Sequence, residues 1–210
     1  MPLSQGKRST AVEAALHAMD IESGAIARAR DLVRAALPAA IELLSAAKGR
    51  VVVSGLGKSG HIGAKIAATL ASTGTPAQFV HSTEALHGDS GMVREGDVAI
   101  FISNSGETAD VCQFGRMLSE RGVPIIAMTG DEGSTLARLA RVVLSIDVER
   151  EADPLGLAPT ASTAATLAIG DALASALMTV SGFTEADFAL RHPGGSLGAQ
   201  LVPALREARP

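Results

Sequence analysis

The stretch "VVVSGLGKSGHIGAK", residues 51–65, decides the fold class of this chain. Its three opening valines are β-branched and predict a buried strand. Glycines follow at positions 55, 57 and 60, and an alanine-rich segment typical of a helix comes after them. Strand, glycine-rich turn and helix in this order place an anion at a helix N-terminus. The stretch therefore predicts an α/β protein that binds a phosphate.

Two nucleotide-binding motifs come close to this pattern, and both fail. The residues "GKS" at 57–59 match the end of a P-loop, but the glycine that a P-loop needs five residues before Gly57 is Val52. The glycine spacing also fits the dinucleotide motif G-x-G-x-x-G. A dinucleotide site needs an acidic residue at the end of the second strand to bind ribose, and that strand ends here with His81. A dehydrogenase is therefore not expected.

Apolar runs alternate with helical segments on the C-terminal side of this stretch. Continuous apolar strands are typical of a parallel sheet whose two faces are covered by helices. We expect a three-layer α/β/α, flavodoxin-like fold with a five-stranded parallel sheet, and ligands at the carboxyl ends of the strands. The predicted strands are 51–54, 77–80, 97–103, 123–128 and 142–146, and the predicted helices are 11–36, a segment ending at 47, 59–72, 107–121, 134–140 and 161–181.

The length of 210 residues predicts one domain. Residues 1–9 are expected to be a disordered tail, and residues 10–210 a single domain on which N-terminal helices within 10–48 pack. The most apolar window, 161–180, contains Asp171 and many Ser and Thr residues, so we expect a buried helix and no membrane span. Asp171 is expected to be buried and paired.

Composition limits the possible partners. Lys and Arg total 18 against 22 Asp and Glu, and no long basic cluster occurs, which argues against a nucleic-acid partner. Trp and Tyr are absent and Phe numbers 5, so stacking on bases is not expected. The single Cys112 excludes an internal disulfide, and the first residues lack an apolar signal segment. These features predict a cytoplasmic protein with a small-molecule ligand.

The loop "SNSGETAD", residues 103–110, is the candidate phosphate site and is named the phosphate loop. Ser103, Ser105 and Thr108 surround Gly106 where a predicted strand gives way to a helix. Their hydroxyls and the free N–H groups of the helix start can bind one terminal phosphate. Simple helix capping by Ser and Thr is the alternative explanation. The loop therefore predicts a phosphomonoester site.

Five sequence blocks lie within residues 50–200: "GLGKSGHIGAKIAATLASTGTP", "EALHGDSGMV", "SNSGE", "PLGLAPTASTAATLAIGDALA" and "FALRHPGGSLG". On these blocks, residues 50–200 closely resemble the sugar isomerase (SIS) domain of the arabinose 5-phosphate isomerases. The resemblance implies an isomerase that interconverts D-ribulose 5-phosphate and D-arabinose 5-phosphate through an enediol, at the entry to 3-deoxy-D-manno-octulosonate synthesis for lipopolysaccharide. It also implies that no cofactor is required and that the chain forms a homotetramer. Many family members carry a pair of CBS domains, and this chain resembles the short members without them.

The same resemblance implies the site residues. It carries the functional lysine to Lys58 and the acidic residue before "PLGLAPT" to Glu151, which we expect to be the general base. A metal at His81 is expected to be adventitious or inhibitory. The implied catalytic residues are Lys58, His87, Asp110, Glu151 and His192, and the substrate-binding residues are Gly74, Thr75, His81, His87, Ser103, Ser105, Gly106 and Thr108.

Several assignments remain open at this stage. Asp110 stands where the family usually has Glu, and the loss of one methylene leaves open whether Asp110 shares the base role with Glu151. Glu107 lies beside the phosphate, where the ligand would repel a carboxylate. His87 and Asp89 could form a structural pair. The alternative functions are a non-catalytic phosphosugar-binding module and an isomerase of another ketose phosphate.

Overall fold

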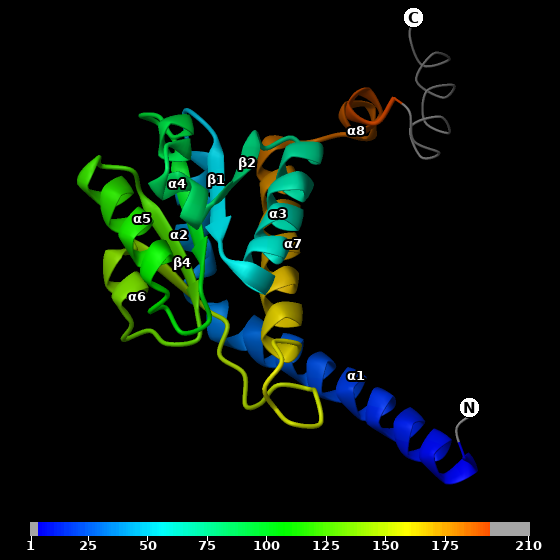
Figure 1. Cartoon of the computed structure of the whole chain (residues 1–210). Coiled ribbons are helices and arrows are strands. Elements are labelled where there is room, and N and C mark those ends of the chain that lie inside the picture. Colours follow the sequence, from blue (N-terminus) through cyan, green and yellow to red (C-terminus); the bar gives the residue numbers. More distant parts are fainter. Residues whose placement is uncertain (1–3, 194–210) are drawn as a thin grey trace, which may run out of the picture.

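A five-stranded parallel sheet forms the centre of the computed structural model, which describes residues 4–193 (Figure 1). Its strand order is β2-β1-β3-β4-β5, the order of flavodoxin-like folds, so the predicted fold class is confirmed. Each strand is a short apolar run, and β1 and β3 are buried along their whole length. The strands are β1 Val51–Gly55, β2 Ala77–His81, β3 Val98–Ile102, β4 Ile125–Thr129 and β5 Val142–Ser145.

Helices cover both faces of the sheet. Alternation along β3 sends Ile100 and Ile102 toward the layer with α1, α2, α3 and α7, and Phe101 toward the layer with α4, α5 and α6. The two buried clusters therefore lie on opposite faces of one sheet. The helices are α1 Gln5–Val33, α2 Leu37–Ser45, α3 Gly57–Ser72, α4 Ser82–Leu86, the 3-10 turn η1 Asp89–Met92, α5 Ala109–Glu120, α6 Thr135–Leu139, α7 Ala161–Ser181 and α8 Glu185–Arg191.

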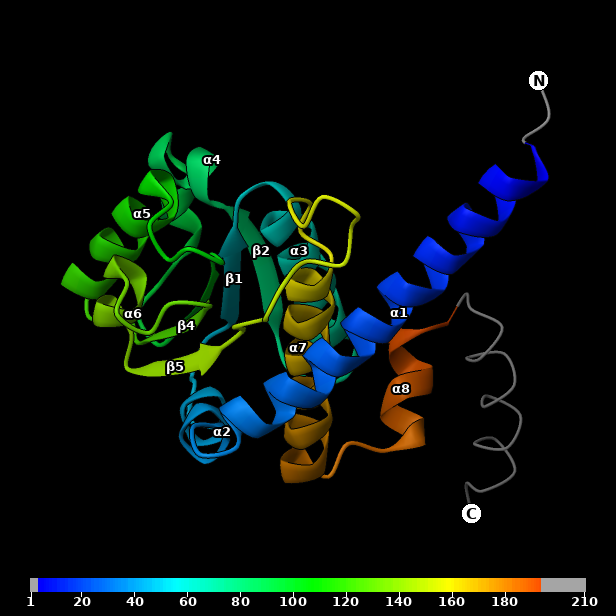
Figure 2. The ribbon, with the colours of Figure 1, turned by 90° about the horizontal axis from the view of Figure 1, so that it is seen from below.

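The first helix crosses α7 and extends beyond the body of the domain toward the N-terminus (Figure 2). The predicted tail over residues 1–9 is wrong for residues 5–9, which form the first turns of α1. The reason is local, since the Ser4 side chain accepts a hydrogen bond from the Lys7 N–H and caps the helix. Residues 1–3 lie outside the described residues, as do residues 194–210 of the predicted domain.

The long apolar helix α7 packs against α1, α2 and α3. Within residues 4–193 it is the one helix whose length and composition would allow a membrane span, and its buried face belongs to the core of the domain. A side chain at Gly170 would collide with Ile66 of α3, so the two helices lie close together. Asp171 is paired as predicted, with Lys65, but about half of its side chain is exposed because the pair lies at the rim of the α3–α7 contact.

Candidate active site

The loop between β3 and α5 brings the three predicted phosphate-binding hydroxyl residues together. Ser103 is buried, its Oγ lies 3.0 Å from Thr108 Oγ1, and it accepts a hydrogen bond from the Gly106 N–H. Ser105 Oγ accepts from the Glu107 N–H at 3.2 Å. Thr108 stands at the N-cap of α5 yet makes no side-chain capping bond. Simple capping therefore does not account for the Thr108 hydroxyl, which pairs with Ser103 instead.

Gly106 gives this loop its shape. Its φ is +64°, and a Cβ at this position would collide with the Ser134 side chain and lie 2.8 Å from Thr129 Oγ1. Its carbonyl accepts hydrogen bonds from the Leu136 N–H at 3.0 Å and from Cys112 Sγ at 3.2 Å. Glycine is therefore required here by both backbone conformation and space, and the loop is fixed against α6.

The Glu107 side chain contacts the start of α6. Its Oε1 accepts a hydrogen bond from the Thr135 N–H at 2.7 Å, in the first turn of α6. That hydrogen bond is the largest cause that lowers the pKa of Glu107, and the nearby Arg138 and Arg116 lower it further. The carboxylate thus stabilises the start of a helix.

Lys58 and His87 lie on segments that follow the carboxyl ends of β1 and β2. Lys58 is exposed in the first turn of α3, directly after β1. His87 is exposed at the C-cap of α4. In the part of the chain that the structure describes, no hydrogen bond or ion pair joins His87 to Asp89, so the structural pair considered above does not form.

His81 closes β2 beside Gly55 of β1. Its ring packs edge-on against Phe79, with 6.3 Å between the ring centroids. Its Nδ1 is buried and has no hydrogen-bond partner among residues 4–193. Within the same range, no group of three or more His, Cys, Asp or Glu side chains is arranged to hold a metal ion. The predicted metal at His81 therefore has no preformed set of protein ligands in the described chain.

The two remaining acidic candidates have different surroundings. Asp110, in the first turn of α5, accepts one hydrogen bond on Oδ2 from Thr83 Oγ1 at 2.6 Å. Glu151 lies at the N-terminus of α7, where Oε2 accepts from the N–H groups of Thr160 at 2.7 Å and Ser162 at 3.2 Å. The hydroxyls of Thr160 and Ser162 also donate to it, the latter to Oε1. Both oxygens of Glu151 are thus occupied.

The same contacts set the charge state of Glu151. Burial raises its pKa, but the hydrogen bonds from the Ser162 hydroxyl and from the N–H groups of Thr160 and Ser162 outweigh burial, so the pKa of Glu151 lies below its ordinary value. A carboxylate with a lowered pKa is a weaker base. In this arrangement Glu151 caps α7, a role that its place before "PLGLAPT" does not reveal.

The loop after Glu151 is ordered by one side chain. The Asp153 carboxylate accepts hydrogen bonds from the N–H groups of Leu155, Leu157 and Ala158 at 2.7–2.9 Å. These bonds hold the turn formed by "DPLGLAP", residues 153–159, next to the N-terminus of α7. They also lower the pKa of Asp153 against the opposing effect of burial, which is the largest single cause.

Three predicted site residues lie away from the carboxyl ends of the strands. Gly74 and Thr75 precede β2, and the Phe183 ring occupies the space where a side chain at Gly74 would lie. His192 ends α8, stacks on Phe188 at 3.9 Å between centroids and follows Arg191, which lies over the Phe183 ring. The 21 residues of α7 separate this region from Glu151 by about 30 Å at 1.5 Å per residue. Within one chain, these residues therefore lie far from Glu151, and Gly74 and Thr75 lie at the strand end opposite to the phosphate loop.

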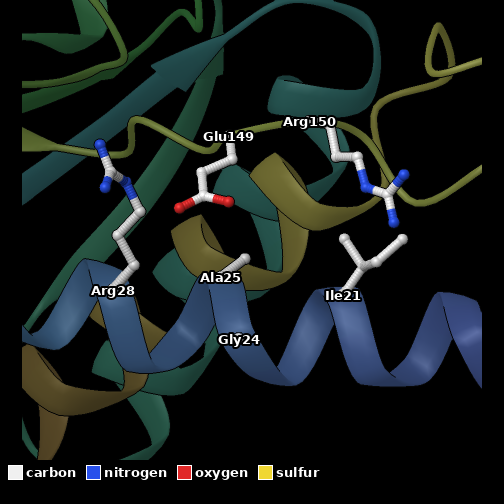
Figure 3. Close-up of a pocket in the computed structure, with 6 residues that line it drawn as sticks. All are labelled: Ile21, Gly24, Ala25, Arg28, Glu149 and Arg150. Carbon is white, nitrogen blue, oxygen red and sulfur yellow. The ribbon is translucent and has the colours of Figure 1, made fainter.

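A separate cavity of about 250 Å³ lies between α1 and the segment after β5 (Figure 3). Its arginines already have partners, since Arg28 pairs with Asp147 and Arg150 lies 2.7 Å from His17 Nε2. No residue of the 103–108 loop lines it. The lining residues are Ile21, Gly24, Ala25, Arg28, Glu149 and Arg150.

A parallel sheet whose carboxyl edge carries a hydroxyl-lined loop at a helix N-terminus defines an α/β protein with a candidate site for an anion. The family model for the SIS domain matches residues 43–176. This chain therefore belongs to the SIS domain family.

Two curated relatives are similar to most of this chain. Arabinose 5-phosphate isomerase KdsD of Pseudomonas aeruginosa is 56% identical over 163 residues, which are 78% of this chain and 50% of that protein. KdsD of Escherichia coli K12 is 51% identical over 190 residues, 90% of this chain and 58% of that protein. The chain thus spans about half the length of the curated relatives it matches.

Solved structures agree with the fold. The structure of Escherichia coli CFT073 c3406 in complex with arabinose 5-phosphate has a TM-score of 0.85 and 43% identity, and the match covers 91% of this chain and 100% of that one. A putative phosphosugar isomerase from Bacteroides fragilis has a TM-score of 0.83 and 36% identity, with coverage of 88% and 98%.

Proposed function

We propose that this chain is an aldose-ketose isomerase that interconverts D-ribulose 5-phosphate and D-arabinose 5-phosphate. The observation that carries the proposal is the pairing of the buried Ser103 hydroxyl with Thr108 at the open start of α5, which suits a terminal phosphate. Relatives at 51% and 56% identity bear the name arabinose 5-phosphate isomerase, which favours this activity over binding alone and over other ketose phosphates.

The proposed reaction moves protons and needs no redox cofactor. A base removes the proton on carbon 2 of the aldose to give an enediolate, a proton passes from oxygen 2 to oxygen 1, and the base returns its proton to carbon 1 to give the ketose. Lys58 is the proposed cation for the developing oxyanion, and His87 the proposed proton donor near the sugar oxygens. Lys58 follows β1, which pairs with β3, the strand from which the phosphate loop begins, and His87 lies beyond β2, on the other side of β1.

Asp110 is the proposed general base in place of Glu151. Glu151 has four hydrogen-bond contacts and a lowered pKa, whereas the Asp110 carboxylate has one partner. Asp110 also lies two residues beyond Thr108 of the phosphate loop. Replacing Asp110 with Asn should lower turnover by about two to four orders of magnitude, the usual scale for loss of a general base.

The test is solvent deuterium exchange at carbon 2 of arabinose 5-phosphate, measured for wild type, Asp110→Asn and Glu151→Gln. Loss of exchange in Asp110→Asn alone supports the assignment. Wild-type exchange in Asp110→Asn would contradict it. Wild-type protein that neither isomerises ribulose 5-phosphate nor exchanges the hydrogen would contradict the proposed activity.

The proposed assembly is a homotetramer whose sites combine residues of different chains. Its support is the separation of His192, Gly74 and Thr75 from Glu151 by the length of α7, together with exposed apolar residues on α1 such as Leu16 and Met19, 58% and 68% exposed. Mixing inactive His192→Ala with inactive Asp110→Asn should restore activity. Mixed oligomers that never recover activity would place both residues in one chain's site.

The proposed setting is the cytoplasm and the first step of 3-deoxy-D-manno-octulosonate synthesis for lipopolysaccharide. Its support is the resemblance to arabinose 5-phosphate isomerases over most of the chain. Deletion of the gene should remove arabinose 5-phosphate from cell extracts, unless a second isomerase is present, and fractionation should place the chain with cytoplasmic markers.

A further inference from the structure

One hydrogen bond beside the phosphate loop involves a residue, Thr83, that has no role in the proposed reaction. Thr83, in α4, donates from Oγ1 to Oδ2 of Asp110, in α5, over 2.6 Å. The two residues are 27 positions apart, and both are half-buried. The bond joins the helix that follows β2 to the helix that follows β3.

We infer that Thr83 is a positioning residue that fixes the Asp110 carboxylate for proton transfer, an inference that rests on the proposed function. Hydrogen bonds from a hydroxyl to a carboxylate are short and strong, and 2.6 Å is within that class. The β-branched threonine side chain has restricted rotation about χ1, which keeps its hydroxyl in place. The donor is therefore suited to hold one carboxylate oxygen still.

The helix that carries Thr83 is itself anchored. The neighbouring Ser82 is buried, and its Oγ lies 2.9 Å from Ser54 Oγ at the end of β1. Ser54 in turn donates to the Val80 carbonyl of β2 at 2.6 Å. The start of the helix that carries Thr83 is thus anchored to strands β1 and β2 of the sheet.

The bond leaves the other oxygen of Asp110 available. Within residues 4–193, no hydrogen bond reaches Asp110 Oδ1. Glu151 and Glu107 differ, because hydrogen bonds hold Glu151 by both oxygens and Glu107 against the start of α6. Glu107 also has a second oxygen without a hydrogen bond in the described chain, but its Oε1 holds the first turn of α6. Of the three acidic candidates, Asp110 is the one that is tethered by a side-chain hydroxyl and keeps an oxygen without a partner in the described chain.

Because the Asp110 side chain is short, the hydrogen bond from Thr83 has a large effect on the position of its carboxylate. Aspartate has one fewer side-chain torsion than glutamate, so a single hydrogen bond at Oδ2 restricts the position of the carboxylate more than it would for glutamate. A displacement on the scale of an ångström at a reacting group can cost about a hundredfold in rate. Thr83 therefore should affect the chemical step more than substrate binding.

The experiment compares Thr83→Val, which removes the hydroxyl and keeps the shape, with Thr83→Ser, which restores a donor. We expect kcat of Thr83→Val to fall about tenfold or more and KM for ribulose 5-phosphate to stay within about twofold, while Thr83→Ser remains within about threefold of wild type. Deuterium exchange at carbon 2 should fall in parallel with kcat. The control is Thr179→Val, which removes an exposed helix hydroxyl bonded to the Ser175 carbonyl.

A double variant separates positioning from simple packing. In an Asp110→Asn background, Thr83→Val should lower the rate of exchange by less than about twofold, because the tethered carboxylate is already gone. Equal loss in both backgrounds, or wild-type kcat in Thr83→Val, would overturn the inference while leaving the isomerase intact. Absence of activity in the wild type would overturn the proposed function and this inference with it. If Thr83→Val fails to fold, Thr83→Ala supplies the same comparison.

Discussion

The Glu151→Gln variant distinguishes a helix cap from a general base. Glutamine keeps the shape of the side chain and one acceptor oxygen, but it removes the negative charge at the N-terminus of α7 and the second oxygen, which accepts from Ser162. Loss of a capping side chain costs about 0.5–2 kcal/mol, and a charge near a helix end contributes about 0.3–1 kcal/mol. We expect the free energy of unfolding to fall by about 1–2 kcal/mol.

Thermal and denaturant unfolding check this magnitude. For a domain of this size, about 1–2 kcal/mol lowers Tm by about 2–8 °C. A capping role predicts kcat within about tenfold of wild type, whereas a base role predicts a loss of about 10²–10⁴. The matched control is Glu149→Gln, which removes an exposed carboxylate from the same segment. Unchanged stability combined with a large loss of turnover would refute the capping assignment and return the base to Glu151.

The pH dependence of this effect has a definite sign. The pKa of Glu151 in the folded chain lies below its ordinary value of 4.5. A depressed carboxyl pKa contributes stability above the unfolded pKa, and this contribution is lost as the pH falls through the folded pKa. The difference in Tm between wild type and Glu151→Gln should therefore be full at neutral pH and decrease below about pH 4.5. A difference that persists unchanged at lower pH would mean that the charge is not its source.

Three further variants test the loop and the helix packing. Gly106→Ala introduces a Cβ that collides with the Ser134 side chain at a positive φ, so unfolding experiments should find a loss of about 2 kcal/mol or more, and calorimetry should find no sugar-phosphate binding. Ser103→Ala should weaken sugar-phosphate binding by about 1–2 kcal/mol while far-UV circular dichroism stays unchanged; equal affinity would contradict the phosphate assignment. Lys65→Met removes the half-exposed pair with Asp171 and should change the free energy of unfolding by less than about 1 kcal/mol, whereas a larger loss would mean that the pair is part of the core.

Sequence patterns predicted the sheet well because each strand is a bounded apolar run. The strand predicted at 77–80 occupies 77–81, and the helix predicted at 59–72 begins at Gly57. Two short helices were missed, since α4 and α8 have five and seven residues and form no periodic pattern, whereas the equally short α6 was predicted at 134–140. The capping box of α8, formed by Thr184 and Asp187, is a local signal that could have located it.

The site was harder to predict, because its decisive contacts join distant residues. The spacing within "SNSGETAD" placed Ser103 and Thr108 in one loop, as the structure has them. The partners of Glu107 and Asp110, which are Thr135 and Thr83, lie 28 and 27 residues away, and no motif encodes these pairs. The matching sequence blocks also do not indicate at which end of the strands a residue lies.

The turn held by Asp153 carries two leucines outward, since Leu155 and Leu157 are 78% and 77% exposed. Ordering a flexible segment costs about 1–2 kcal/mol per residue in backbone entropy. Here folding has already met that cost through one carboxylate, so a contact with either leucine would retain nearly all of its hydrophobic gain. The turn is in thermodynamic terms a preorganised apolar surface, and Asp153→Ala would convert it into one that must be ordered at each encounter.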